Sequence, residues 1–178
     1  RQAIIAQTVY PSRTKRDSKR SSKADRKMTA KQETILVVDD EQVIRRLLKR
    51  MLSKEGYHCQ EAGDAEEALE KLRENAISLV LLDIKMPGKS GIELLPEIKT
   101  LYPDIAVVMA TAVTEVGVAI QCLKYVADDY ICKPFNLDEA SVVVQRALEK
   151  RHLQLKIREY QQYLEEKVEE QTEEIRRL

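Results

Sequence analysis

Residues 78–88 read SLVLLDIKMPG and carry the strongest fold signal in the chain. The four apolar residues from Leu79 to Leu82 are typical of a strand that is buried on both faces, as in a parallel sheet. The run ends at Asp83, and Pro87-Gly88 then predicts a turn. Open α/β sheets bind ligands at the carboxyl ends of their strands, so Asp83 is a candidate site residue. The alternative is that Asp83 only caps the segment that follows.

The same alternation of strand and helix continues on both sides of this stretch. Further strands are predicted at residues 35–38, 57–62, 105–110 and 129–132, and helical spacing of apolar residues follows each strand. Asp64 with Glu67 predicts a capping box, and Asn136 with Glu139 predicts the start of the last helix. Five strands alternating with five helices predict an α/β fold, with a doubly wound parallel sheet covered by helices on both faces.

Polar residues stand where four of these strands end. Because parallel strands end at one edge of the sheet, we expect these residues to lie close together. Carboxylates in one cleft repel each other, and Mg²⁺ would relieve this repulsion; a carboxylate can also attack phosphorus and become an aspartyl phosphate. A lysine and a hydroxyl can then contact the phosphoryl oxygens. The residues are Asp39, Asp40, Asp83, Thr111 and Lys133.

Each of these residues also has a simpler interpretation. Asp39 and Asp40 could be helix-capping acids, Thr111 could only terminate its strand, and Lys133 could be a solvated loop lysine.

Four ordered motifs, ILVVDDE, LVLLDIKMPGKSGIELL, VVMATA and DDYICKPF, resemble those of the receiver domain of two-component response regulators. The resemblance covers residues 33–150 and implies a flavodoxin-like fold. It implies that Asp83 accepts a phosphoryl group from a sensor histidine kinase or a phosphotransfer protein. It also implies that the chain is a phosphoacceptor switch that assists its own Mg²⁺-dependent phosphorylation and dephosphorylation, and is not otherwise an enzyme.

The same resemblance assigns the remaining site residues. Asp39, Asp40 and the backbone carbonyl of Lys85 would bind Mg²⁺ together with Asp83. Thr111 and Lys133 would bind the phosphoryl group, and Thr111 with Tyr130 would form the switch; Tyr130 could instead be a core tyrosine. A cis peptide bond is expected between Lys133 and Pro134.

Two positions depart from the family pattern. Val126-Ala127 stands where receivers commonly have Gly-Ala, and Lys85 places a second cation beside Asp83. The Lys85 side chain could prolong the lifetime of the phosphoryl group by occupying the path of the attacking water, or it could extend into solvent.

Residues 1–32 are predicted to be a disordered basic tail. They hold ten Lys/Arg against two acids, Asp17 and Asp25, so the tail carries about +8 and the rest of the chain about −8. Such a tail can attract nucleic acid, but the stretch between Pro11 and Met28 has no aromatic residues interleaved, which favours a solvated tail and no nucleic-acid partner. Met28 could be the natural start of the protein.

The composition excludes several other classes of protein. The three cysteines, Cys59, Cys122 and Cys132, have neither metal-ligand spacing nor a paired framework, which is typical of a reducing cytosol. No apolar run approaches the roughly 18 residues that a membrane span requires, and no secretory signal peptide is evident. We therefore expect a cytoplasmic protein without a membrane partner.

From Leu137 to Leu178 the chain contains neither Gly nor Pro, which predicts one long helix projecting from the domain. Within residues 151–178 its apolar positions are spaced by three or four residues, with one extra residue that interrupts the heptads. This seam predicts a parallel coiled-coil homodimer; the alternative is a single solvated helix. The seam residues are Leu153, Ile157, Tyr160, Leu164, Val168, Gln171, Ile175 and Leu178.

The segment REYQQYLEEKVEEQTEEIRRL also resembles connectors that lead to HD-type cyclic di-GMP phosphodiesterase output domains. The expected function is therefore a phosphorylation-dependent response regulator that relays its state through a dimeric helix to an output absent from these residues. The alternative is a constitutive coiled-coil adaptor with a vestigial receiver.

Overall fold

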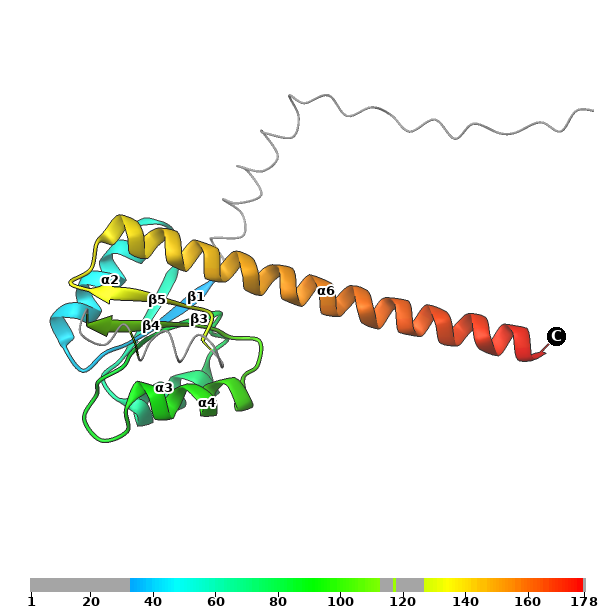
Figure 1. The fold of residues 1–178 in the computed structure, drawn as a ribbon, viewed down its shortest axis with the longest axis horizontal. Helices are drawn as coiled ribbons and strands as arrows, with labels where there is room; N and C mark the ends of the chain where they lie inside the picture. Colours follow the sequence, from blue (N-terminus) through cyan, green and yellow to red (C-terminus); the bar gives the residue numbers. More distant parts are fainter. Residues whose placement is uncertain (1–32, 113–116, 118–126, 178) are drawn as a thin grey trace, which may run out of the picture.

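The computed structural model describes residues 33–112, 117 and 127–177 (Figure 1). Its five strands form one parallel sheet in the order β2-β1-β3-β4-β5, which confirms the predicted fold class. All strand ends named above therefore lie at one edge. The strands are β1 (Thr34–Val38), β2 (His58–Ala62), β3 (Leu79–Asp83), β4 (Ala106–Ala112) and β5 (Asp129–Lys133).

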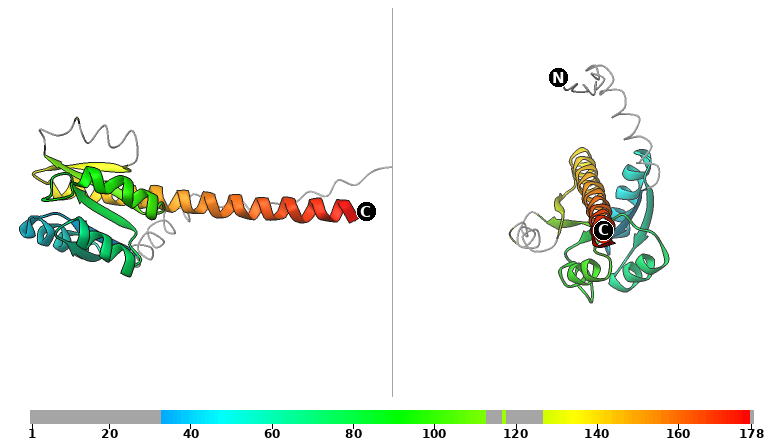
Figure 2. Two further views of the ribbon diagram at one scale, coloured as in Figure 1. Left: turned by 90° about the horizontal axis from the view of Figure 1, so that it is seen from below. Right: turned by 90° about the vertical axis from the view of Figure 1, so that its right-hand side faces the viewer.

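Helices cover both faces of the sheet (Figures 1 and 2). On one face lie α2 (Gln42–Lys54) and the first part of α6 (Leu137–Arg177), and on the other lie α3 (Ala65–Glu74) and α4 (Gly91–Leu101). The helix expected through Ile120 and Leu123, and the tail of residues 1–32, lie outside the described residues.

Alternating residues of the central strands supply two apolar cores, because successive side chains of a strand point to opposite faces. Leu36 and Val80 belong to the core under α3 and α4, while Ile35 and Leu81 belong to the core under α2 and α6. Both faces are therefore buried, which explains why the strands contain nearly unbroken apolar runs.

The helix starts agree in part with the sequence. Asn136 Oδ1 accepts hydrogen bonds from the main-chain N–H groups of residues 138 and 139, as predicted for α6. At α3, Asp64 accepts from the Glu67 N–H, but the Glu67 carboxylate accepts from Gly63 and not from Asp64, so the predicted capping box is only half formed. The reciprocal capping box lies at α4, between Ser90 and Glu93.

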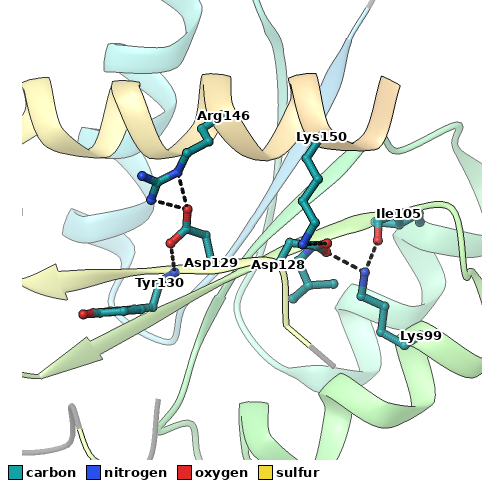
Figure 3. Close-up of polar contacts among 8 residues, drawn as sticks. Lys99, Ile105, Asp128, Asp129, Tyr130, Arg146 and Lys150 are labelled. Atoms are coloured by element: carbon teal, nitrogen blue, oxygen red, sulfur yellow. Dashed lines mark hydrogen bonds and ion pairs between the residues drawn. The ribbon is translucent and has the colours of Figure 1, made fainter. Parts of the chain in front are cut away.

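Helix α6 is unbroken over 41 residues and extends beyond the sheet at the edge opposite the strand ends (Figure 1). Ion pairs join its first half to the start of β5 and the residue before it: Arg146 pairs with Asp129, and Lys150 lies 3.4 Å from Asp128 (Figure 3). Even so, neither α6 nor another described helix has an apolar stretch suited to crossing a bilayer.

Candidate functional site

Three carboxylates meet at the carboxyl edge of the sheet. Asp39 and Asp40 follow β1 directly, and Asp83 is the last residue of the neighbouring strand β3. One oxygen from each carboxylate lies within 4.8 Å of the others. Asp39 and Asp83 are 1% and 5% exposed, whereas Asp40 is open to solvent. The sheet topology thus brings together three acids that are 44 residues apart at most in the sequence.

Lys133, the last residue of β5, places its ammonium between two of these acids. Its Nζ lies 2.7 Å from Asp39 Oδ2 and 3.0 Å from Asp83 Oδ2, with 19% of the side chain exposed. The other Asp39 oxygen accepts a hydrogen bond from the main-chain N–H of Glu41, at the start of α2. Glu41 is the N-cap residue of α2, so this bond stabilises the turn before the helix and does not cap the N–H groups of its first turn. Asp39 instead faces the cluster.

The pocket is rich in negative charge. Burial raises the pKa of the Asp83 carboxyl, and the Asp39 charge adds to this effect; hydrogen bonds from Lys133 and from the main chain of Lys85 oppose it without cancelling it. Burial favours the neutral form of Lys133, but its hydrogen bonds to Asp39 and Asp83 outweigh burial, and the pKa of Lys133 is raised. One ammonium is shared by two buried acids, so these acids carry more negative charge than Lys133 balances.

Thr111 and Tyr130 occupy neighbouring strands beside this cluster. Thr111 is fully buried within β4, which continues to Ala112, and its hydroxyl donates to the Ala112 carbonyl at 3.1 Å. Thr111 thus stands inside its strand and does not terminate it. Tyr130 is partly buried and packs against the core under α3 and α4. Lys85 lies two residues beyond Asp83 with an exposed side chain.

The peptide bond between Lys133 and Pro134 is cis, as the resemblance implied.

Sequence reasoning missed two residues that shape the cluster. Arg45 of α2 donates hydrogen bonds to the main-chain carbonyls of both Asp39 and Asp40. Gly91, the first residue of α4, lies so close to β3 that a Cβ there would be 1.9 Å from the Asp83 carbonyl oxygen. Two sequence signals could have found them. One is an arginine in the second turn of a helix that follows paired acids, and the other is a glycine at the start of a helix that follows a strand-end acid.

The arrangement suits a hard divalent cation and a phosphoryl group. Carboxylate oxygens are the ligands that Mg²⁺ prefers, and it usually binds through one or two carboxylates, waters and a phosphate. A carboxylate such as that of Asp83 is chemically able to attack phosphorus, and an ammonium such as that of Lys133, 3.0 Å away, can balance charge on phosphoryl oxygens.

Comparison with known proteins gives a consistent result. The family model described as "Response regulator receiver domain" matches residues 35–145. Regulatory protein AtoC of Escherichia coli K12 is 37% identical over 130 residues, covering 73% of this chain and 28% of that protein. NtrX of Azorhizobium caulinodans is 39% identical over 130 residues, covering 72% and 29%. The receiver domain of NtrX from Brucella abortus superimposes with a TM-score of 0.63 at 42% identity, covering 65% of this chain and 98% of that one.

The chain thus spans less than a third of the length of these two curated relatives. The family match ends at residue 145, so the likeness of the last segment to connectors of HD-type output domains gains no support from the comparisons.

Proposed function

Because the chain belongs to the response regulator receiver domain family, we propose that it is a phosphorylation switch whose acceptor is Asp83. The donor would be a sensor histidine kinase or a phosphotransfer protein, and the reaction would take place in the cytoplasm. The observation that carries this proposal is the cluster itself: three acids within 4.8 Å of one another and a lysine that bridges the two buried ones.

The cluster fits Mg²⁺ as its cofactor. Asp39, Asp40, Asp83 and the backbone carbonyl of Lys85 would hold the ion, all through oxygen atoms. When bound, the ion neutralises charge on the acids and on the phosphoryl oxygens during transfer. Burial raises the pKa of the Asp83 carboxyl and the nearby Asp39 charge adds to the rise, so a second cation that stabilises the ionised form of Asp83 suits this pocket.

The protein's own residues would then perform the transfer. An Asp83 oxygen attacks phosphorus, forming an O–P bond as the bond from phosphorus to the donor's histidine nitrogen breaks. Lys133 moves its hydrogen bonds toward the phosphoryl oxygens, and Thr111, within the adjacent strand β4, supplies its hydroxyl to one of them. Thr111 would thereby exchange its present bond to the Ala112 carbonyl for one to the phosphoryl group.

The switch would reach α6 through β5. Tyr130 turns inward when Thr111 moves. In the sequence, Tyr130 stands between Lys133 and the two acids that pair with α6, Asp128 and Asp129. Asp128 binds Lys99 of α4 at 2.6 Å, the Val107 N–H at 2.9 Å and Lys150 of α6 at 3.4 Å (Figure 3). A shift of β5 therefore acts on both α4 and α6 at once.

The test uses beryllofluoride with Mg²⁺, which imitates the aspartyl phosphate, on the full chain. We expect shifted amide resonances around Thr111 and Tyr130, and none in Asp83→Ala. Acetyl phosphate should likewise label the wild type only. An unchanged wild-type spectrum, or an equal response of Asp83→Ala, would reject the switch and leave the vestigial-receiver adaptor.

The exposed face of α6 supports a second part of the proposal, a homodimer through residues 151–178. Large apolar side chains lie along one stripe of the helix and are exposed. Their exposed fractions are 55% at Leu153, 58% at Ile157, 62% at Tyr160, 44% at Leu164, 62% at Val168 and 71% at Ile175. A single helix gains nothing from such a stripe, whereas a coiled coil buries it.

Leu164→Lys is expected to raise the dimer dissociation constant at least about 100-fold, since two leucines leave the interface and each contributes about 2 kcal/mol. Sedimentation equilibrium measures this constant. Glu166→Lys, two residues away and off the seam, is the matched control and should leave the dimer intact. A wild type that sediments as a monomer with and without beryllofluoride would contradict the dimer but not the phosphorylation of Asp83.

A further inference from the structure

The guanidinium of Arg45 contacts the main chain of two of the clustered acids. Its Nη1 is 2.6 Å from the main-chain oxygen of Asp39 and 3.1 Å from that of Asp40, so one nitrogen donates to both peptides. Only 16% of the Arg45 side chain is exposed. We propose that Arg45 is a positioning residue, which sets the orientation of the two acids for cation binding; this inference rests on the proposed Mg²⁺ site.

The other side of the guanidinium is held by β2. Arg45 Nε lies 3.8 Å from a Glu61 oxygen, and the second Glu61 oxygen lies 2.8 Å from the Lys49 ammonium, one turn further along α2. A Cβ on Gly63 would stand 3.5 Å from Arg45 Nη1, in ordinary contact. Arg45 is thus fixed between β2 and the turn that joins β1 to α2, and this restricts where its two acceptor carbonyls can lie.

The segment that Arg45 contacts is short, and its main chain is also held by hydrogen bonds from the Asp39 N–H to the Ala62 carbonyl and from the Arg45 N–H to the Glu41 carbonyl. Three residues, 39 to 41, join β1 to α2. The Asp39 side chain is held by the Glu41 N–H and by Lys133. The Asp40 side chain is exposed, and Arg45 donates a hydrogen bond to the Asp40 carbonyl. Arg45 therefore controls the orientation of Asp40 more than that of Asp39.

Ligand orientation matters here because Mg²⁺ demands nearly ideal octahedral geometry at about 2.0–2.1 Å. Groups that orient metal ligands from outside the coordination shell typically change affinity about 10- to 100-fold when they are removed. A guanidinium fits this role because its rigid fork can donate to two carbonyls while its Nε faces a carboxylate.

The experiment compares Arg45→Ala with Arg46→Ala in the full chain, by calorimetric titration with Mg²⁺ alone. Both variants lose one positive charge from the same helix, but Arg46 is exposed. We expect Arg45→Ala to raise the Mg²⁺ dissociation constant about tenfold or more. Arg46→Ala should stay within about twofold, because solvent and salt screen an exposed charge.

A second variant separates positioning from folding. Glu61→Gln leaves Arg45 in the chain but removes the negative charge beside its guanidinium. This variant should also weaken Mg²⁺ binding, though less than Arg45→Ala does. The effects of the two substitutions should not add in the double variant. A purely structural arginine would instead lower the melting temperature of the metal-free protein and leave the dissociation constant unchanged.

The outcomes distinguish the two proposals. A wild type that binds no Mg²⁺ would overturn the proposed function together with this inference. A wild type that binds Mg²⁺, with Arg45→Ala binding equally well, would overturn the inference alone. Equal weakening by Arg45→Ala and Arg46→Ala would assign the effect to net charge and would also overturn it.

Discussion

Gly91→Ala is expected to destabilise the fold by about 3 kcal/mol or more, the upper end of the cost of overpacking. The added Cβ would meet the Asp83 carbonyl oxygen at 1.9 Å and the Asp83 carbonyl carbon at 2.9 Å. Both are main-chain atoms of a central strand, so no side chain can rotate away to relieve the contact. Either α4 must move outward or the end of β3 must bend.

Both movements affect function as well as stability. The Gly91 N–H also donates to the Ile84 carbonyl, so α4 begins against the residue that follows Asp83. We expect the melting temperature to fall by about 6–12 °C, at 2–4 °C per kcal/mol for a chain of this size. Phosphorylation of Asp83 should decline together with stability.

Gly63→Ala is the matched control for this substitution. The nearest atoms to its added Cβ are side-chain atoms of Arg45 and Glu67 at 3.5 and 3.6 Å, which is ordinary van der Waals contact. Its stability should therefore stay close to wild type or rise by about 0.4–1 kcal/mol through reduced freedom of the unfolded chain. Thermal unfolding followed by circular dichroism checks both variants, and equal melting temperatures would contradict the close approach at Gly91.

Lys133→Ala is expected to destabilise the metal-free protein by about 3 kcal/mol at pH 7, since removing one partner leaves buried carboxylates unpaired. Asp39 and Asp83 would then share a nearly buried pocket without the ammonium that now lies within 3.0 Å of both. Unfolding in EDTA measures the change. Lys167→Ala, which removes an exposed ion pair to Glu170 on α6, is the control and should cost at most about 1 kcal/mol.

Asp83→Asn is expected to stabilise the metal-free protein at pH 7, whereas Lys133→Ala destabilises it. Burial raises the pKa of Asp83 in the folded state, so the folded protein holds this proton more tightly than the unfolded chain. The stability that results is present below the unfolded pKa of about 4 and is lost as the pH rises through the folded pKa. The variant should therefore be more stable than wild type at pH 7 in EDTA, and its advantage should shrink toward pH 4. A variant less stable than wild type at pH 7 would contradict the raised pKa.

The fold and the membership of the cluster were predictable because both follow from periodicity and strand ends. Apolar runs that are buried on both faces require a parallel sheet, and a parallel sheet gathers the ends of β1, β3 and β5 at one edge. Asp39, Asp40, Asp83 and Lys133 meet there as expected. Their roles toward Mg²⁺ and phosphate remain proposals.

Contacts that depend on the exact path of the main chain were not predictable. Glu67 was expected to bond the Asp64 N–H but bonds that of Gly63, one residue earlier, and the full capping box formed at Ser90 and Glu93. Spacing alone does not separate these two sites, because both have an acid or hydroxyl followed by Glu three residues later. The hydrogen bond from Arg45 to the Asp39 carbonyl depends likewise on the angle at which α2 leaves the sheet.

The unbroken run of α6 makes it a lever. Beyond Leu148, the last core residue on this helix, 29 residues extend to Arg177 and span about 43 Å at 1.5 Å per residue. A tilt of roughly 10° at the base would then swing the tip by about 7 Å. Small displacements beside Asp128 and Asp129 would thus be magnified at the distant end, where the two helices of the proposed dimer would move apart or together.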